Sequence, residues 1–122
     1  MIRRILHTGV EVADIEKART LYDNMGFQQI YQLDKPELHA KLIALKKGDT
    51  AIELWQFDDH DHQYHQFIKN HISILSDDLD NDVEQLVKNG FKIVIPKTEG
   101  DLLRYVFVQD TAGLCYEVAV EK

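Results

Sequence analysis

The chain has 122 residues, of which 44% are hydrophobic and 29% are charged, a composition typical of one folded globular domain rather than a disordered, fibrous or membrane protein. Its 14 lysines and arginines against 21 acidic residues leave a net charge of −7, which repels nucleic-acid phosphates and anionic lipid surfaces. No apolar run approaches the roughly 20 residues that span a bilayer. With a single cysteine, Cys115, and no N-terminal signal pattern, we expect a cytoplasmic protein.

The first half of the chain is predicted to begin with a strand over residues 4–12 and a helix over 14–25. Asp14 is a favourable N-cap, and Gly26 ends the helix because glycine tolerates the left-handed conformation that follows a helix. The apolar positions expected to face the core are Ile15, Ala18, Leu21, Tyr22 and Met25. Three strands are expected next, at 27–33, 40–46 and 50–57. The last two form a hairpin with its turn at Gly48.

A polar segment without apolar periodicity, residues 58–66, follows and is interpreted as a linker. It contains three histidines, His60, His62 and His65, among several acidic residues. Because such a linker lacks the strand or helix support that fixes ligand geometry, we interpret these histidines as solvated rather than as metal ligands.

The second half of the chain repeats the order of the first. A strand that includes His71 to Leu75 precedes a helix over 78–89, which Asp77 or Asp78 caps and Gly90 ends. Three strands are expected after it, at 91–95, where Pro96 stops the pairing, and at 102–108 and 114–120. The last two again form a hairpin, here through the turn-forming residues 110–113.

A shift of 64 residues places the first half of the sequence on the second, which indicates a tandem repeat. The coinciding pairs are His7 and His71, Asp14 and Asp78, Gly26 and Gly90, Phe27 and Phe91, and Glu53 and Glu117. Repeat unit one covers 1–57, the linker 58–66 and repeat unit two 67–122. The predicted fold class is α+β, a single domain of two tandem βαβββ units related by a pseudo-two-fold axis, with curved mixed sheets that form a cup.

Candidate metal ligands are placed by the alternation of side chains along strands. The apolar neighbours of Glu53, His71 and Glu117 mark the core side, which leaves these three side chains on the opposite, concave face. A carboxylate on an inner sheet face is costly unless it is paired or bound to a cation. With His7, the repeat partner of His71, the set predicts a divalent metal site. Two imidazoles and two carboxylates suit zinc, nickel, manganese, cobalt or ferrous iron without choosing among them.

Several short motifs carry a family resemblance that covers nearly the whole chain. They are His7-Thr8-Gly9 followed by Asp14, Leu21-Tyr22 through Gly26-Phe27, Ile52-Glu53-Leu54, Asn70-His71-Ile72, and Phe107-Val108-Gln109-Asp110 through Gly113 to Tyr116-Glu117-Val118. The sequence thereby resembles the vicinal oxygen chelate superfamily, which includes glyoxalase I, fosfomycin-resistance proteins, extradiol dioxygenases and methylmalonyl-CoA epimerase. The resemblance implies ligands from the first and last strands of each unit, at His7, Glu53, His71 and Glu117.

This ligand set is most similar to that of glyoxalase I, because the dioxygenases and fosfomycin enzymes use two histidines and one glutamate and need no Glu53. The resemblance implies a metal-dependent isomerase or lyase that acts through an enediolate on a small substrate with two neighbouring oxygens, such as a thiol adduct of methylglyoxal. Glu117 is the expected base and Glu53 the second candidate. Glu11 stands near the position where glyoxalase I enzymes usually carry an arginine for the glutathione carboxylate, which leaves the thiol open.

Two other functions within the superfamily remain open from the sequence. One is a metal-free or metal-assisted binding protein of the bleomycin-resistance type, and the other is an extradiol-type dioxygenase. Small relatives often complete the cup with a second chain, so we expect a homodimer with two sites. Each site either closes within one chain or mixes His7 and Glu53 of one chain with His71 and Glu117 of the other.

Residues of a substrate pocket are less strongly indicated. Trp55, Phe57, Tyr105 and Phe107 either line the pocket or belong to the core or a dimer interface. Arg104 either binds a substrate carboxylate or lies on the surface. Cys115 has no electropositive neighbours in the sequence that would make it a nucleophile.

Overall fold

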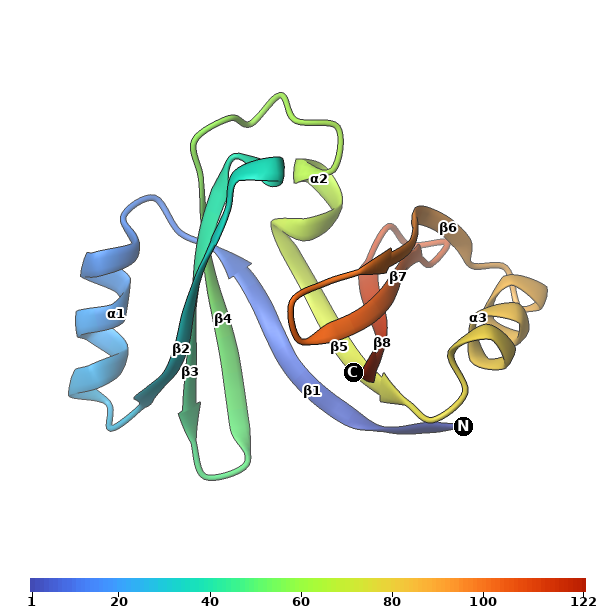
Figure 1. Ribbon diagram of the computed structural model, residues 1–122, viewed down its shortest axis with the longest axis horizontal. Helices are drawn as coiled ribbons and strands as arrows, with labels where there is room; N and C mark the ends of the chain where they lie inside the picture. The colour runs from blue at the N-terminus through green and yellow to red at the C-terminus, as the bar shows by residue number, and fades with distance from the viewer. The chain divides into compact units, whose positions relative to one another are not determined.

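The computed structural model describes residues 1–122, the whole chain, and divides into two compact units. The first unit is His7–Asn70, and the second unit combines Met1–Leu6 with His71–Lys122. The boundary falls inside β1 (Ile2–Glu11), so the two units share that strand. Each unit contains the order βαβββ, and the predicted α+β fold of two βαβββ units is confirmed (Figure 1).

The elements of the first unit after β1 are α1 (Ile15–Asn24), β2 (Gln28–Lys35), the 3₁₀ helix η1 (Pro36–Leu38), β3 (Ala40–Lys47), β4 (Thr50–Phe57) and α2 (His65–Ile68). The strands lie in the order β2-β3-β4-β1, with β1 parallel to β4 and the other neighbours antiparallel. Helix α1 packs against this sheet through a core of buried side chains, Ile15, Ile43, Leu45 and Leu54. The face of β4 that carries Leu54 is therefore the helix-covered face.

The elements of the second unit are the first residues of β1, then β5 (Asn70–Ser76), α3 (Leu79–Lys88), β6 (Lys92–Glu99), β7 (Leu103–Gln109) and β8 (Cys115–Glu121). The order β5-β8-β7-β6 repeats that of the first unit, and β5 is parallel to β8. Helix α3 packs on the sheet through a second core, Leu79, Val83, Val106, Val108 and Val118. None of the helices has the length and apolar character to span a membrane.

The repeat found in the sequence is also present in the structure. Helix α3 is α1 displaced by 64 residues at both ends, since 15 + 64 = 79 and 24 + 64 = 88. The same shift relates the two parallel strand pairs, because Gly9 lies opposite Glu53 and Ser73 lies opposite Glu117. Even the register shift between residues 29 and 31 of β2 recurs between 93 and 95 of β6. The third strand departs from this shift by one residue, since Ala44 lies opposite Glu53 and Phe107 lies opposite Glu117, and β6 has a second register shift between Ile95 and Thr98. The two units are thus built on one plan, with the same pairing in their parallel strands.

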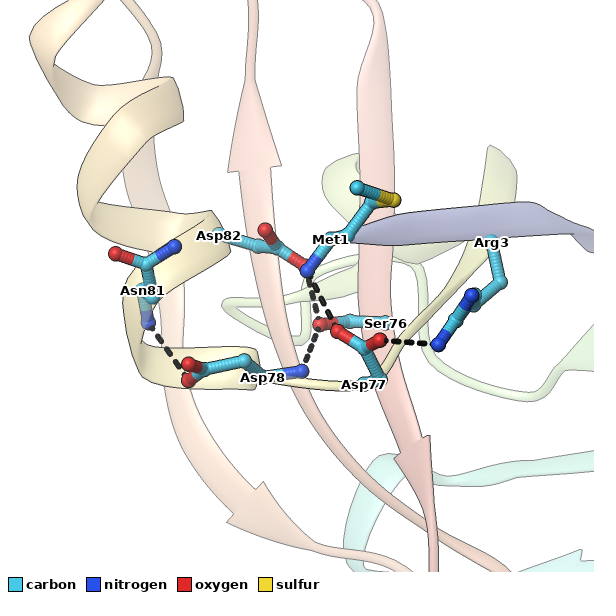
Figure 2. A network of polar contacts seen from close by, with 7 residues as sticks. All are labelled: Met1, Arg3, Ser76, Asp77, Asp78, Asn81 and Asp82. Carbon is cyan, nitrogen blue, oxygen red and sulfur yellow. Dashed lines mark hydrogen bonds and ion pairs between the residues drawn. The ribbon is translucent and has the colours of Figure 1, made fainter.

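Both helices begin and end as their flanking residues predict. The side chain of Asp14 accepts hydrogen bonds from the backbone N–H groups of Glu16 and Lys17 at 3.1 Å. At α3 the cap is Asp78, which accepts from Asn81 N at 3.3 Å (Figure 2). The alternative cap, Asp77, instead pairs with Arg3, whose guanidinium lies 2.7 Å from its carboxylate, and with the Met1 ammonium (Figure 2). These contacts attach the first residues of β1 to the start of α3 within the second unit.

The structure corrects three sequence-based expectations. Leu21 and Met25 do not belong to the buried stripe of α1, because they are 64% and 50% exposed. The strand expected to stop at Pro96 continues to Glu99, since β6 is an edge strand and its pairing with β7 is irregular between Ile95 and Thr98, two settings in which a strand tolerates proline. The polar segment 58–66 is not structureless to its end, because α2 begins at His65.

Candidate functional site

The first unit holds a buried imidazole against a buried carboxylate. His7 in β1 and Glu53 in β4 are 7% and 6% exposed, and His7 Nε2 lies 3.0 Å from Glu53 Oε1. Because Ile52 and Leu54 pack with the α1 core, Glu53 projects from the opposite face of the sheet. Two donor atoms that bind one ion at about 2.1 Å, at angles of about 90–110°, lie roughly 3.0–3.4 Å apart. The spacing of this pair therefore fits two ligands of a single metal ion.

Two further side chains fix the carboxylate of Glu53. The Tyr31 hydroxyl donates to Oε2 at 2.9 Å, and the Trp55 indole Nε1 donates to Oε1 at 3.1 Å. Tyr31 comes from β2, two strands away, and the residue between them in β3 is Ala44. A small residue at this central position leaves room for the tyrosine ring to cross the roughly 9.6 Å between alternate strands. Such hydrogen bonds to a ligand carboxylate are typical of metal sites.

Sequence analysis missed Tyr31 as a site residue. Its position relative to Glu53 depends on the pairing of β2 with β3 and of β3 with β4, including the register shift that precedes Tyr31. The alternation of side chains along β2 assigns Tyr31 to one face of the sheet. It does not indicate which residue of another strand lies beside Tyr31 on that face, because this depends on the register between strands.

The second unit carries the matching pair, His71 in β5 and Glu117 in β8, which are 2% and 7% exposed. Ser73 lies opposite Glu117 in the parallel pairing and on the same side of β5 as His71. The Ser73 hydroxyl is fully buried and has no hydrogen-bond partner in the protein. A buried polar atom without a partner costs free energy, so its presence beside two potential ligands fits a position where a bound polar group completes its hydrogen bonding.

The aromatic residues considered for a substrate pocket divide between the two units. In the second unit Phe107 lies opposite Glu117, with its ring centroid 5.0 Å from that of His71 and 5.7 Å from that of Tyr105. In the first unit the Trp55 and Phe57 rings are stacked at 5.6 Å, and Trp55 also contacts Glu53 as described. The structure thus brings each aromatic pair to the strand face that bears a candidate ligand.

Arg104 and Cys115 are placed differently from these residues. Arg104 alternates with Tyr105 along β7, is exposed and forms an ion pair with Glu99, so it does not lie with the aromatic side chains. Cys115 is 3% exposed, and burial together with the negative charge of Asp110 raises the pKa of its thiol. A buried thiol of raised pKa is not an activated nucleophile.

Comparison with known proteins identifies relatives of the fold. The sequence model of the Glyoxalase/Bleomycin resistance protein/Dioxygenase superfamily matches residues 4–118 of this chain. Methylmalonyl-CoA epimerase from Mycobacterium tuberculosis superposes with a TM-score of 0.84 at 19% identity, covering 99% of this chain and 89% of that one.

Two other solved structures have a similar fold at the same sequence identity. A variant of methylmalonyl-CoA epimerase from Streptomyces coelicolor, in complex with 2-nitronate-propionyl-CoA, gives a TM-score of 0.84 at 19% identity and 99% coverage of both chains. A hypothetical protein from Bacillus halodurans gives 0.81 at 19% identity, covering 98% of this chain and 94% of that one. No curated protein matches the sequence. At these identities the structural likeness establishes the fold alone.

Proposed function

Because the chain belongs to the Glyoxalase/Bleomycin resistance protein/Dioxygenase superfamily, we propose that it is a metal-dependent isomerase or lyase that moves a proton at a carbon next to a carbonyl group. The observation that carries this proposal is the repetition of one arrangement: a buried histidine and a buried glutamate on adjacent parallel strands, in the same register in both units. Glyoxalase and epimerase chemistry both need such a proton transfer.

The metal ligands in this proposal are His7, Glu53, His71 and Glu117, supplied within one chain or across a homodimer. The chemistry that a bound divalent metal supplies is Lewis-acid polarisation of a substrate carbonyl held through two neighbouring oxygens. Zinc, nickel, manganese, cobalt and ferrous iron all suit this donor set. The substrate would be lined by the aromatic side chains on the strand faces that carry the ligands, Trp55, Phe57, Tyr105 and Phe107.

The two glutamates are suited to different tasks. Both oxygens of Glu53 are held by Tyr31 and Trp55, which favours a fixed ligand whose charged form is stabilised. We assign the mobile role to its repeat partner, Glu117. A carboxylate ligand that loosens from a metal can act as a general base, so Glu117 takes the proton from the substrate carbon, leaving an enolate or enediolate, and returns it.

The substrate class follows from the reaction rather than from a pocket shape. The epimerases of similar fold act on an acyl-CoA thioester, and a thioester shares with a thiol adduct of methylglyoxal an acidic C–H beside a carbonyl. Both compounds are therefore test substrates. The diagnostic measurement is exchange of that hydrogen for deuterium in heavy water, followed by NMR with metal-loaded protein.

Elemental analysis of protein purified without a histidine tag tests the metal directly. We expect about one equivalent of a transition metal at this site per chain, lost in Glu53→Ala and in His71→Ala. Oxygen consumption with catechols would favour a dioxygenase instead. A metal-free protein that binds an aromatic drug between its stacked rings, without hydrogen exchange in either substrate, would favour a binding protein of the bleomycin-resistance type.

A further inference from the structure

A second group of metal-binding side chains lies in the first unit and shares no residue with the pair His7 and Glu53. It consists of Glu11 at the end of β1, His60 in the segment after β4 and His65 at the start of α2. One ligand atom from each lies within 4.8 Å of the others. Glu11 Oε2 is 2.5 Å from His65 Nε2 and 3.4 Å from His60 Nε2. The sequence-based interpretation of these histidines as solvated is therefore wrong for His65, whose side chain is 11% exposed, and right for His60, whose side chain is 66% exposed.

The imidazole rings are oriented by aromatic contacts rather than left free in solvent. The His60 and His65 rings stack with centroids 4.6 Å apart and an interplanar angle of 20°. The ring of Phe57, from β4, meets His65 edge-to-face at 4.8 Å. The side chain of His65 is only 11% exposed, whereas that of His60 is 66% exposed. Both Nε2 atoms are thereby directed toward one carboxylate oxygen, with an open side at His60.

We propose that Glu11, His60 and His65 bind a divalent transition metal of the zinc class. Two imidazoles and one carboxylate form a donor set that such ions prefer, and the open side leaves room for water ligands. Ligand atoms around one ion lie roughly 3.0–3.4 Å apart, so the His60 contact at 3.4 Å already has this spacing. The His65 contact at 2.5 Å needs a side-chain shift of under about 1 Å.

The electrostatic setting favours a cation at this position. The segment that carries His60 also contains Asp58, Asp59 and Asp61, and the whole chain has a net charge of −7. A negative local potential raises the concentration of divalent cations near the ligands. Bound metal would join the end of β1 to the segment between β4 and α2, which is otherwise irregular. The site does not depend on the proposed reaction, because it uses a separate ligand set.

Zinc stoichiometry after equilibrium dialysis and elemental analysis tests this second site. We expect Glu11→Gln and His60→Ala each to bind one equivalent fewer than the wild-type chain. Glu11→Gln is nearly isosteric and His60 is exposed, so both variants retain the fold, which circular dichroism checks. The matched control is His62→Ala, because His62 lies in the same segment but faces His39, with ring centroids 5.8 Å apart. This control should bind as much zinc as the wild type.

Repeating the measurement in the Glu53→Ala background separates the two metal sites. There the remaining equivalent should disappear when Glu11→Gln is added. Unchanged stoichiometry in Glu11→Gln and His60→Ala would overturn the second site, and so would an equal loss in His62→Ala. A chain whose zinc content depends on Glu11 but not on Glu53 would contradict the proposed catalytic site and leave this one standing.

Discussion

At the scale of single residues, the buried carboxylate of Glu53, a proposed metal ligand, is held in place by side chains from several strands. A buried carboxylate is costly, and here its two oxygens receive hydrogen bonds from Tyr31 and Trp55 and a contact from His7. The three neighbours come from β2, β4 and β1, so several strands of the sheet together orient the Glu53 carboxylate. Ala44, which lies between Tyr31 and Glu53 in the sheet, makes the Tyr31 contact possible because its small side chain leaves room for the tyrosine ring.

Removing the Tyr31 hydroxyl should therefore weaken binding of the proposed metal. We expect Tyr31→Phe to lower metal affinity by about 10-fold, the usual lower bound for an outer-sphere partner of a ligand. The change should also cost about 1 kcal/mol of unfolding free energy, because one hydrogen bond to a buried carboxylate is lost. Competition with a chelating dye and denaturant titration measure the two effects. Tyr22→Phe is the matched control, since Tyr22 lies on α1 and packs with Phe27. Equal losses in both variants would remove the assigned role of Tyr31.

The base is tested by Glu117→Gln, which keeps the shape and removes the proton acceptor. We expect turnover to fall by at least about 100-fold, within the usual contribution of general base catalysis, while bound metal stays above half of the wild-type content. Deuterium exchange in the substrate and elemental analysis of the same sample separate the two quantities. Full activity in a metal-loaded Glu117→Gln protein would transfer the role of base to Glu53.

At the scale of elements, the two helices share a mode of termination that the repeat preserves. Gly26 and Gly90 follow α1 and α3 with φ of 93° and 98°, a conformation that residues with a Cβ atom rarely adopt. The next residues, Phe27 and Phe91, donate backbone hydrogen bonds to Tyr22 and Leu86 in the last turn of the preceding helix. The glycine therefore sets the direction in which each chain returns to its sheet.

A substitution at Gly90 isolates this backbone effect. A Cβ atom at Gly90 would meet only the Thr111 methyl group, at 3.7 Å, so steric overlap contributes little. We expect Gly90→Ala to lower the unfolding free energy by about 1–2 kcal/mol because of the left-handed conformation. Gly90→Asn should cost less, since asparagine tolerates that conformation better. Urea unfolding of the three proteins gives the comparison. If alanine and asparagine are equally destabilising, local strain is not the cause.

At the scale of the whole molecule, several large apolar side chains remain exposed. They include Ile5 at 60%, Ile30 at 53% and Ile93 at 50%. Association of two chains would remove such side chains from water. A homodimer remains our expectation because the proposed ligand set can be completed by a second chain.

Sedimentation equilibrium at micromolar concentration checks the assembly. With a chain mass of 14.2 kDa, the dimer should sediment as a particle of twice that mass, 28.4 kDa. Mixing Glu53→Ala with His71→Ala protein adds a second readout. If ligands come from both chains, a mixed dimer regains one intact site and therefore part of the bound metal. A particle of 14.2 kDa that retains the equivalent lost in Glu53→Ala would place the whole of this site within one chain.

Features determined by neighbouring residues were predictable from the sequence. Asp14 and Asp78 cap helices, Gly26 and Gly90 end them, and strand alternation separates Leu54 from Glu53. Each of these features depends on contacts between residues a few positions apart, which are close in the structure because they are close in the sequence. The sequence repeat then predicted the fold of the whole chain, because two copies of one sequence pattern are expected to form two copies of one structural unit.

Features that depend on the register between strands were decided only by the tertiary structure. Tyr31 reaches Glu53 through the pairing of three strands, and Pro96 is tolerated because β6 lies at an edge. Glu11 and His65 are separated by 54 residues and meet only after β1 and α2 pack in one unit. Side-chain alternation assigns a residue to a face of a strand, but which residues meet across that face depends on packing between distant segments, which no local pattern records.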